Sequence, residues 1–503
     1  MSSFFNYLLR LDTHFKPFKL WPLIFIGLLL FISRDSGEQQ LIPLLYQQQS
    51  LYKDIPLPAV QVAGTHNSYC STSYGYNLCN NGEIPRHFLS LTEQLDRGFR
   101  LLELDVHYIP QLSEANSTSK TDAIDSSAFR LCHPCGDGCF WLSLICLKSI
   151  PDYGKGHRGC SKHALTLEKA FCEIIEWLRR HPDEFVFLYL DSFIDDVAAG
   201  IALNECTENW SQSLAFSQQD LAIWRTNNGI SSDTYDSWPS IRQLLEMGKQ
   251  LIIDSRIDNT VVNENSFIFP DLSNIRWPYS QLQYLKPLHE QMTKNLSLNE
   301  GAFQRSLQSE DSRVGCGIRT LSESEQTIGV YSPYFSRMVW EGHLTGRAWK
   351  WLKDAVHCGY SFRVDVPNFS TWNRILRIFE WSFSTVGSSQ WVKGHSCTKL
   401  TTERWKTVSN DENDWASVAC VCEEWYSKNY LSARGYRQSW WCTSSSYPCL
   451  SKMQGNQLCN QSKPSSCASA SFSSPVTALE NEILKYTMKD YGVDSVWIAS
   501  NDH

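Results

Sequence analysis

Strand-sized apolar runs alternate with helix-like segments from Pro58 to about residue 384, and this alternation limits the fold more than any other feature. The clearest helical segment is Thr166–His181, in which apolar residues recur three and four positions apart. Strands that alternate with helices favour a parallel sheet covered by helices. The apolar runs are Ala59–Ala63, Phe99–Val106, Phe129–Cys132, Phe185–Leu190, Leu251–Ile253 and Phe362–Val366.

The length of this region suits a closed sheet better than an open one. We therefore expect an α/β fold, a TIM-type (β/α)8 barrel over residues 58–384. The strand pattern is weak between Asn259 and Tyr331, so several barrel strands cannot be assigned and the barrel could be irregular.

The N-terminal region carries an apolar run of 13 residues, Leu20–Ile32, with basic residues before it. This run is shorter than the roughly 20 residues of a typical membrane-spanning helix and matches the length of a signal peptide. We expect residues 1–36 to be a signal peptide or a signal anchor, and both stay open. Residues 37–57 are polar and predict a linker. Either reading places the remainder on the extracellular or lumenal side, with residues 20–32 as the membrane anchor if the segment is retained.

Cysteine content points to the same compartment. The chain has 18 cysteines, and such a count indicates disulfides in an oxidising environment. Seven of them fall in residues 385–503, which we expect to form a disulfide-rich C-terminal extension containing many tryptophans. Five Asn-x-Ser/Thr sites are potential glycosylation acceptors. These sites are Asn116, Asn209, Asn295, Asn368 and Asn460.

Net charge excludes one class of partner. The formal charge is −8 and no stretch is dense in lysine and arginine, whereas nucleic-acid binding normally needs a basic patch. We expect no nucleic-acid partner.

Polar residues end several of the apolar runs, where catalytic groups collect in a parallel barrel. Glu103 and Asp105 lie two positions apart, so on a strand they face the same side, and their charges repel unless a cation compensates. Asn67 and Asp191 end two other runs and would complete an oxygen ligand set for a divalent metal, Ca²⁺ or Mg²⁺.

Two histidines also end apolar runs. His66 and His133 are suited to acid–base chemistry near neutral pH, although a single histidine at a strand end is more often a structural hydrogen-bonding residue. Asp365, near the end of the last run, could orient a histidine or serve as a structural carboxylate.

Three segments together resemble a known family. Gly64–Ser68, Gln94–Asp105 and Leu131–His133 look like the X-domain of phosphatidylinositol-specific phospholipases C, in the style of the secreted, cysteine-containing PLC-like phosphodiesterases. The resemblance is strong over Pro58–Ser192, weaker as far as Asn368, and absent from the C-terminal extension.

This resemblance implies metal-dependent phosphodiester cleavage at a membrane surface, through attack of a neighbouring substrate hydroxyl and a cyclic phosphate. His66 and His133 match the family's two histidines, of which one stabilises phosphoryl charge and the other protonates the leaving alcohol. Metal-independent bacterial members carry arginine where Asp105 stands, so the resemblance implies the Ca²⁺-dependent type. The implied metal ligands are Asn67, Glu103, Asp105 and Asp191.

Other functions stay open. A sphingomyelinase-D-like or glycerophosphodiesterase-like enzyme would use a similar set of histidines and carboxylates, and product analysis would separate them. A catalytically idle, secreted glycan-binding protein is a third reading, motivated by tryptophans of the extension. These are Trp415, Trp425, Trp440 and Trp441.

The cysteines around His133 have two interpretations. They could bind zinc or form disulfides, and an oxidising compartment favours disulfides. These cysteines are Cys132, Cys135, Cys139 and Cys146.

Overall fold

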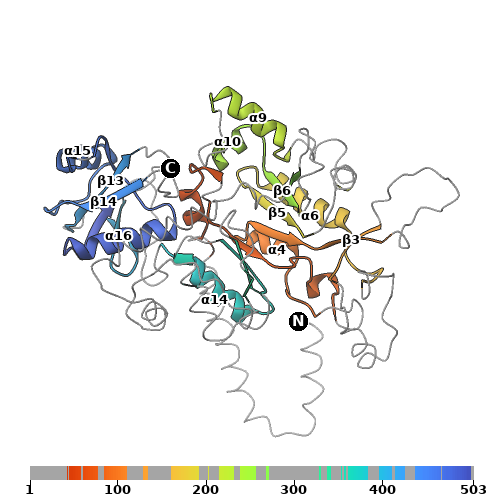
Figure 1. Ribbon diagram of the computed structural model, residues 1–503. Coiled ribbons are helices and arrows are strands. Elements are labelled where there is room, and N and C mark those ends of the chain that lie inside the picture. The colour runs from red at the N-terminus through yellow and green to blue at the C-terminus, as the bar shows by residue number, and fades with distance from the viewer. Residues whose placement is uncertain are drawn as a thin grey trace, which may run out of the picture.

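The structure is a computed structural model (Figure 1). It describes residues 42, 45–57, 60–77, 84–109, 128–133, 160–191, 202, 214–230, 238–255, 268–270, 328–329, 337–340, 353, 356–357, 361–382, 396–409, 414–424, 437–465 and 467–499. Within these ranges no helix is long and apolar enough to cross a membrane. The predicted signal segment at residues 1–36 lies outside the described residues.

The larger part of the molecule is built on an eight-stranded sheet with the strand order β7-β6-β5-β2-β1-β10-β9-β8. Neighbouring strands are parallel except for β8 and β9, which pair antiparallel. The strands are β1 (Ala63–Thr65), β2 (Leu101–Leu104), β5 (Val186–Leu190), β6 (Leu251–Ser255), β7 (Ile268–Pro270), β8 (Ile328–Gly329), β9 (Arg337–Trp340) and β10 (Ser361–Val364).

The first strand of this sheet pairs with the last. Strand β1 lies between β2 and β10, and the register places Thr65 opposite both Leu102 and Val364. A sequential strand order in which first and last strands meet is the order of a barrel cut at one seam. The described residues leave β7 and β8 as the two edges. The predicted mixed α/β fold with a parallel sheet is confirmed, and the closed (β/α)8 barrel stays a prediction.

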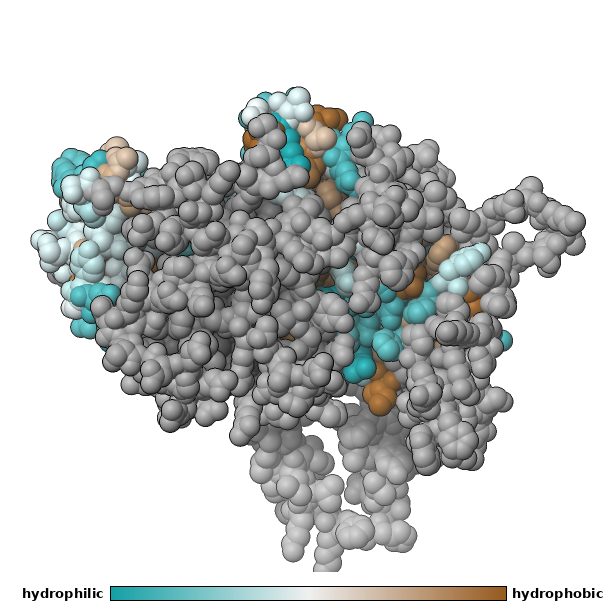
Figure 2. All heavy atoms as spheres, viewed as in Figure 1, coloured by the Kyte–Doolittle hydropathy of each residue, from teal (hydrophilic) through white to brown (hydrophobic). Residues whose placement is uncertain are grey.

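Helices connect and cover these strands (Figure 1). The predicted helix Thr166–His181 is α6 (Leu167–Arg180), whose N-cap Thr166 accepts a hydrogen bond from the backbone of Lys169. Its buried Trp177 donates its indole N–H to Asp96 at 2.7 Å, which ties α6 to α4. The other helices here are α4 (Leu91–Asp96), α9 (Gln218–Asn227), α10 (Ile241–Glu246) and α14 (Phe369–Phe379). Figure 2 shows hydrophobic and hydrophilic residues mixed on the surface over α9 and α10.

One predicted strand has a different role. Phe129–Cys132 was expected to be a parallel strand of the barrel, and this prediction is wrong. Strand β4 (Phe129–Leu131) pairs antiparallel with β3 (Val106–Tyr108) in a separate two-stranded sheet. The physical reason is the connection, because residues 109–127 contain no helical periodicity and antiparallel strands need no crossover helix.

Residues 45–57 correct a second expectation. They belong to the predicted linker 37–57, yet their apolar side chains are buried in the main core, with Leu45 1% and Leu57 0% exposed. The side chain of Gln49 donates to the carbonyl of Gly98 at 2.7 Å. The sequence looks polar because it contains three consecutive glutamines, but two of them, Gln48 and Gln49, donate to backbone carbonyls inside the fold.

The C-terminal extension forms a second, six-stranded sheet with the order β12-β11-β16-β13-β14 and β15 paired to β13. Its strands are β11 (Ser396–Thr401), β12 (Trp405–Ser409), β13 (Ser417–Glu424), β14 (Arg437–Cys442), β15 (Ala470–Phe472) and β16 (Ser495–Ile498). Two helices accompany it, α15 (Lys452–Ser462) and α16 (Ala478–Asp490).

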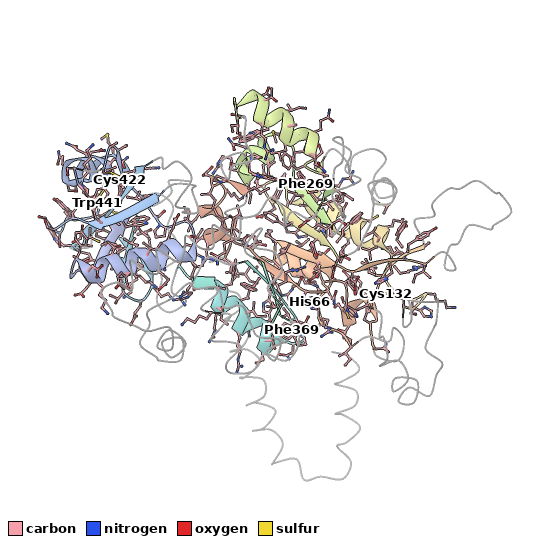
Figure 3. The ribbon with its side chains drawn as sticks, in the orientation of Figure 1. His66, Cys132, Phe269, Phe369, Cys422 and Trp441 are labelled. Atoms are coloured by element: carbon pink, nitrogen blue, oxygen red, sulfur yellow. A yellow bond between two sulfur atoms is a disulfide. The ribbon has the colours of Figure 1, made fainter. Side chains whose placement is uncertain are left out.

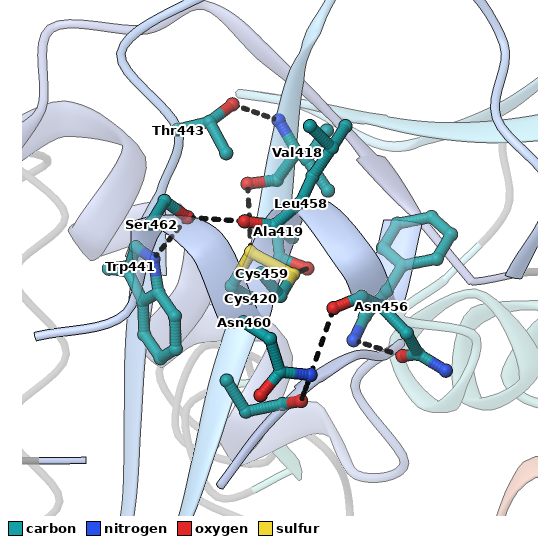
Figure 4. Close-up of a disulfide and its surroundings, with 12 residues drawn as sticks. Val418, Ala419, Cys420, Trp441, Thr443, Asn456, Leu458, Cys459, Asn460 and Ser462 are labelled. Carbon is teal, nitrogen blue, oxygen red and sulfur yellow. Dashed lines mark hydrogen bonds between the residues drawn. A yellow bond between two sulfur atoms is a disulfide. The ribbon is translucent and has the colours of Figure 1, made fainter. Parts of the chain in front are cut away.

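Disulfides connect the elements of this extension, as the cysteine count predicts. Strand β13 carries two of them, Cys420–Cys459 and Cys422–Cys467, and Figure 4 shows the first joining β13 to α15. Cys397–Cys449 is a third, whereas Cys442 is a buried thiol whose pKa burial raises to about 12. The buried Trp441 lies in the apolar cluster that contains the cysteines of β13, whereas the buried Trp440 belongs to the cluster shared with the larger sheet.

The extension packs against the larger sheet. Leu484 and Met488 of α16 belong to the same buried apolar cluster as Phe362 of β10. The backbone N–H of Ala478 donates to the side chain of Gln61 at 3.2 Å. Arg404 reaches Glu380 at the end of α14, with 3.0 Å between Nη1 and Oε2. The extension is therefore joined to the larger part of the molecule through both apolar and polar contacts.

Candidate active site

The turn that follows β1 is held in place by close backbone packing. A Cβ on Gly64 would lie 2.8 Å from the side chain of Leu101, so β1 and β2 approach each other only with glycine there. Asn67 has a φ of 46°, in the left-handed region that asparagine tolerates better than most residues. Residues in such conformations persist where the surrounding structure fixes them, and they are frequent at functional sites.

Ser68 and Gln94 fix this turn to β2. The backbone N–H of Ser68 donates to the carbonyl of Glu103 at 2.8 Å, and its hydroxyl accepts from the N–H of Glu103 at 2.9 Å. The buried amide of Gln94 donates to the carbonyl of Ser68 at 2.9 Å and accepts from the hydroxyl of Thr65 at 2.7 Å. The position of His66 relative to Glu103 is thus set by a buried network.

His66 and Asp365 form a buried pair across β1 and β10. Nδ1 of His66 lies 3.0 Å from Oδ1 of Asp365, and Arg86 contacts the other carboxylate oxygen at 3.2 Å. Burial alone lowers the pKa of His66, but the nearby charge of Glu103 and the hydrogen bond to Asp365 outweigh it and raise that pKa above its ordinary value. Figure 3 labels His66 between α4 and α14.

His87 is a second buried histidine that the sequence patterns do not indicate. Its Nε2 donates to the carbonyl of His66 at 2.6 Å, and its Nδ1 accepts from the backbone of Val366 at 3.3 Å. Burial lowers the pKa of His87 to about 4, so the ring is neutral and can hold both bonds at once. His87 therefore joins the two segments that follow β1 and β10 and carry His66 and Asp365. No periodicity marks it, because it lies between the strands.

Glu103 lies next to this pair inside the sheet. It is 3% exposed, and its Oε1 is 2.8 Å from Nη1 of Arg363, whereas its Oε2 is buried without a hydrogen-bond partner. Burial raises the pKa of Glu103, the positive charges of Arg363 and His66 oppose that change, and the negative charges of Asp191 and Asp105 add to it.

The other two carboxylates are near the same strand ends. Asp191 follows β5, and its backbone N–H donates to the carbonyl of Leu104 at 2.9 Å. Asp105 follows β2 and is paired with His107, with 3.2 Å between His107 Nε2 and Asp105 Oδ1. The amide nitrogen of Asn67 lies 3.4 Å from Nε2 of His66. The sequence does not predict the pairing of His107 with Asp105. The run Phe99–Val106 divides into β2 and β3, and this division brings His107 next to Asp105.

His133 reaches this region through the β3–β4 hairpin. The backbone N–H of Cys132 donates to the carbonyl of Asp105 at 3.1 Å, and Cys132 is disulfide-bonded to Cys160. His133 itself is exposed, unlike the buried His66. Cys132 therefore has the predicted disulfide rather than a zinc ion, with Cys160 as its partner; the other three cysteines of that cluster lie outside the described residues.

The donor set was tested for its fit to a divalent metal. Within the described ranges no three histidine, cysteine, aspartate or glutamate side chains are grouped closely enough to enclose a metal ion. The buried Oε2 of Glu103 nevertheless lacks a hydrogen-bond donor, and Asp105 and Asp191 are close enough to affect its ionisation. Carboxylate oxygens are the ligands that Ca²⁺ and Mg²⁺ prefer. The residue types present therefore fit such a cation, whereas the grouping of the described side chains does not enclose one.

Comparisons with known proteins give limited matches. No family model matches the chain. Two uncharacterized proteins of Mycobacterium tuberculosis, from strains CDC 1551 / Oshkosh and ATCC 25618 / H37Rv, are each 29% identical over 154 residues, which covers 30% of this chain and 26% of the relative. The chain thus matches about a quarter of the length of these relatives.

Two solved structures were also found. A calcium-dependent phosphoinositol-specific phospholipase C from Pseudomonas sp. is 19% identical and covers 41% of this chain and 58% of its own, with a TM-score of 0.23. The phosphatidylinositol-specific phospholipase C from Listeria monocytogenes is 11% identical and covers 66% and 98%, with a TM-score of 0.31. Both TM-scores are low, so the functional argument depends on the residues of the site.

Proposed function

We propose that this protein is a metal-dependent phosphoric diester hydrolase of the phospholipase C type. Its substrates would be phosphatidylinositol-like or glycosylphosphatidylinositol-like phosphodiesters, cleaved at a membrane surface through a cyclic phosphate. The observation that carries the proposal is the buried His66–Asp365 pair next to a carboxylate, Glu103, that has one oxygen without a hydrogen-bond donor.

The pair suits His66 to donate a proton rather than accept one. Because its pKa is raised above the ordinary histidine value, the imidazolium form persists to higher pH than in an isolated histidine. Asp365 accepts from Nδ1 at 3.0 Å, and Nε2 lies 3.4 Å from the side-chain amide nitrogen of Asn67. We assign His66 Nε2 to donate a hydrogen bond to a phosphoryl oxygen as negative charge develops there.

His133 would act on the leaving group. It is exposed at the end of the β3–β4 hairpin, next to Cys132, whose backbone N–H bonds to the carbonyl of Asp105, and from there it could protonate the departing alcohol. The exposure of His133 suits a group that meets a bulky lipid-linked leaving group.

Glu103, Asp105, Asp191 and the side-chain oxygen of Asn67 would hold the divalent cation, with Ca²⁺ preferred and Mg²⁺ as the alternative. When bound, the cation would lower the pKa of the attacking substrate hydroxyl and offset charge on the phosphoryl group. The protein's own contribution is to keep the carboxylates close together despite their repulsion, through burial and the backbone bonds of Ser68 and Asp191.

The test is an assay of the purified protein on phosphatidylinositol vesicles, with Ca²⁺ and with a chelator. We expect the chelator to abolish hydrolysis and His66→Ala to lower kcat by about 100-fold or more. His163→Ala changes an exposed histidine and is the matched control, with activity unchanged. Phosphorus NMR should detect a cyclic inositol phosphate.

Three outcomes contradict the proposal. Hydrolysis that survives both the chelator and His66→Ala would exclude the mechanism. A folded protein without activity on any phosphodiester would favour the glycan-binding reading. Release of choline from sphingomyelin would favour a sphingomyelinase-D-like enzyme, and release of glycerol 3-phosphate from a glycerophosphodiester would favour a glycerophosphodiesterase-like one.

A further inference from the structure

Arg363 is a buried cation inside the larger sheet that no sequence pattern indicates. It lies on β10 two residues before Asp365, so both side chains face the same side of the strand. The residue is 1% exposed, and Nη1 lies 2.8 Å from Oε1 of Glu103. An arginine in such a place keeps its positive charge, because its guanidinium is not deprotonated in proteins.

The guanidinium group also contacts an aromatic ring. Its Cζ lies 4.5 Å from the ring centroid of Tyr189 on β5, a cation–π contact. The hydroxyl of Tyr189 in turn lies 3.5 Å from Oδ1 of Asp191. Arg363 and Tyr189 therefore lie between two carboxylates of the proposed metal site, Glu103 and Asp191.

The two carboxylate oxygens of Glu103 have different surroundings because of Arg363. Oε1 faces the guanidinium, whereas Oε2 is buried and has no hydrogen-bond donor. A cation that binds Oε2 would lie within a few ångströms of the guanidinium charge, and like charges at that distance repel strongly in a buried site.

We propose that Arg363 is a resident cation of the acidic cluster, which neutralises part of its charge and weakens its affinity for a divalent metal. This inference rests on the proposed function in that Glu103 is assigned as a metal ligand. Arg363 is a positioning residue, since it acts through Glu103 and Tyr189. Its effect is to offset the repulsion between the carboxylates when no metal is bound and to allow the metal to dissociate.

The direction in which the Kd for the metal changes when Arg363 is replaced distinguishes this role from a purely structural one. If Arg363 only supports the fold, its removal loosens Glu103 and Asp191 and weakens metal binding. If Arg363 is the resident cation, removal of its charge strengthens metal binding.

The experiment is calorimetric titration of the purified full-length chain with CaCl₂. We expect Arg363→Met, which keeps length and apolar contacts without the charge, to lower the Kd for Ca²⁺ at least tenfold. Arg363→Lys keeps the charge and should stay near the wild-type Kd. Arg363→Gln provides a second neutral side chain, able to donate a hydrogen bond to Glu103.

Arg100→Met is the matched control. Arg100 is also buried, with its Nε 2.9 Å from Oε2 of Glu184 and its Cζ 4.8 Å from the ring of Trp177. Its partner Glu184 is not among the proposed ligands, so Arg100→Met should leave the Kd unchanged. An equal tightening in this control would contradict the assignment of the effect to the site.

An unchanged or weaker Kd in folded Arg363→Met or Arg363→Gln would overturn the inference, as would absence of Ca²⁺ binding in every protein. It would also be overturned if neither neutral variant folds while Arg363→Lys does, because the charge would then serve folding. Failure of the proposed function is distinguishable: Ca²⁺ binding that tightens in Arg363→Met, in a protein that hydrolyses no phosphodiester, would keep this inference and refute the enzyme.

Discussion

Glu380 at the end of α14 lies where the C-terminal extension meets the larger sheet, and its ionisation should control the stability of that contact. It is 3% exposed, and Arg404 of the extension contacts both its carboxylate and its carbonyl oxygen, the latter at 2.6 Å. Burial outweighs the nearby charge of Arg404 and raises the pKa of Glu380 from 4.5 to about 7. The folded protein therefore holds a proton on this carboxyl that the unfolded chain has released.

The sign of the pH effect follows from this difference. Between pH 4.5 and about 7 the folded state binds more protons than the unfolded state at this position, so the stability that Glu380 contributes is present at low pH and is lost as the pH rises through about 7. A shift from 4.5 to about 7 corresponds to a loss on the order of 3 kcal/mol.

Glu380→Gln removes the titration and keeps the shape of the side chain. We expect the variant to be similar to wild type at pH 4.5 and more stable than wild type at pH 8, by up to about 3 kcal/mol. Urea unfolding followed by tryptophan fluorescence at both pH values measures this difference, because other titrating groups cancel between the two proteins. Glu176→Gln, at an exposed carboxylate, is the control. A Glu380→Gln variant that loses stability relative to wild type at pH 8 would refute the reasoning, since the ionised pair with Arg404 would then be the stabilising form.

Two other substitutions test the site and the extension. Asp365→Asn removes the carboxylate that helps to raise the pKa of His66, so if the imidazolium is the active form, the alkaline limb of the pH–rate profile should move to lower pH; an unmoved limb would show that Asp365 does not set this ionisation. Replacing both Cys420 and Cys459 by serine opens a disulfide with a sequence separation of 39 and should lower the free energy of unfolding by about 4 kcal/mol, as measured by urea denaturation; a change near zero would mean that the extension does not depend on this bond.

Local patterns were sufficient for elements that are apolar throughout. The runs Phe185–Leu190 and Leu251–Ile253 correspond to β5 and β6, which are buried on both faces. The helical spacing in Thr166–His181 likewise matches α6. The hydrophobic pattern that identifies each of these elements lies within its own residues, so the sequence alone predicts them.

Elements that depend on distant partners were harder to predict. Phe129–Cys132 has the composition of a barrel strand, yet its pairing with Val106–Tyr108 makes it half of a hairpin. Residues 45–57 look polar, yet five of their apolar residues enter the core. Which sheet a short strand joins is decided by its connection and by its partners, which the strand's own sequence does not contain.

The candidate site divides in the same way. Motif residues such as His66, Glu103 and Asp365 were identified because they lie in or directly after apolar runs. Their partners were not: Arg86 and His87 lie between strands, and Arg363 lies inside one. His66 and Asp365 are 299 positions apart, so only the pairing of β1 with β10 brings them together.

The position of β16 has a consequence for how the protein is made. This strand comes later in the chain than every other described strand of its sheet, yet it lies between β11 and β13. Until residues 495–498 leave the ribosome, the edges of β11 and β13 that pair with β16 have no partner strand. A nascent chain would therefore expose cysteines of β13 until Ser495–Ile498 arrive, and during that interval an incorrect disulfide could form and trap the extension.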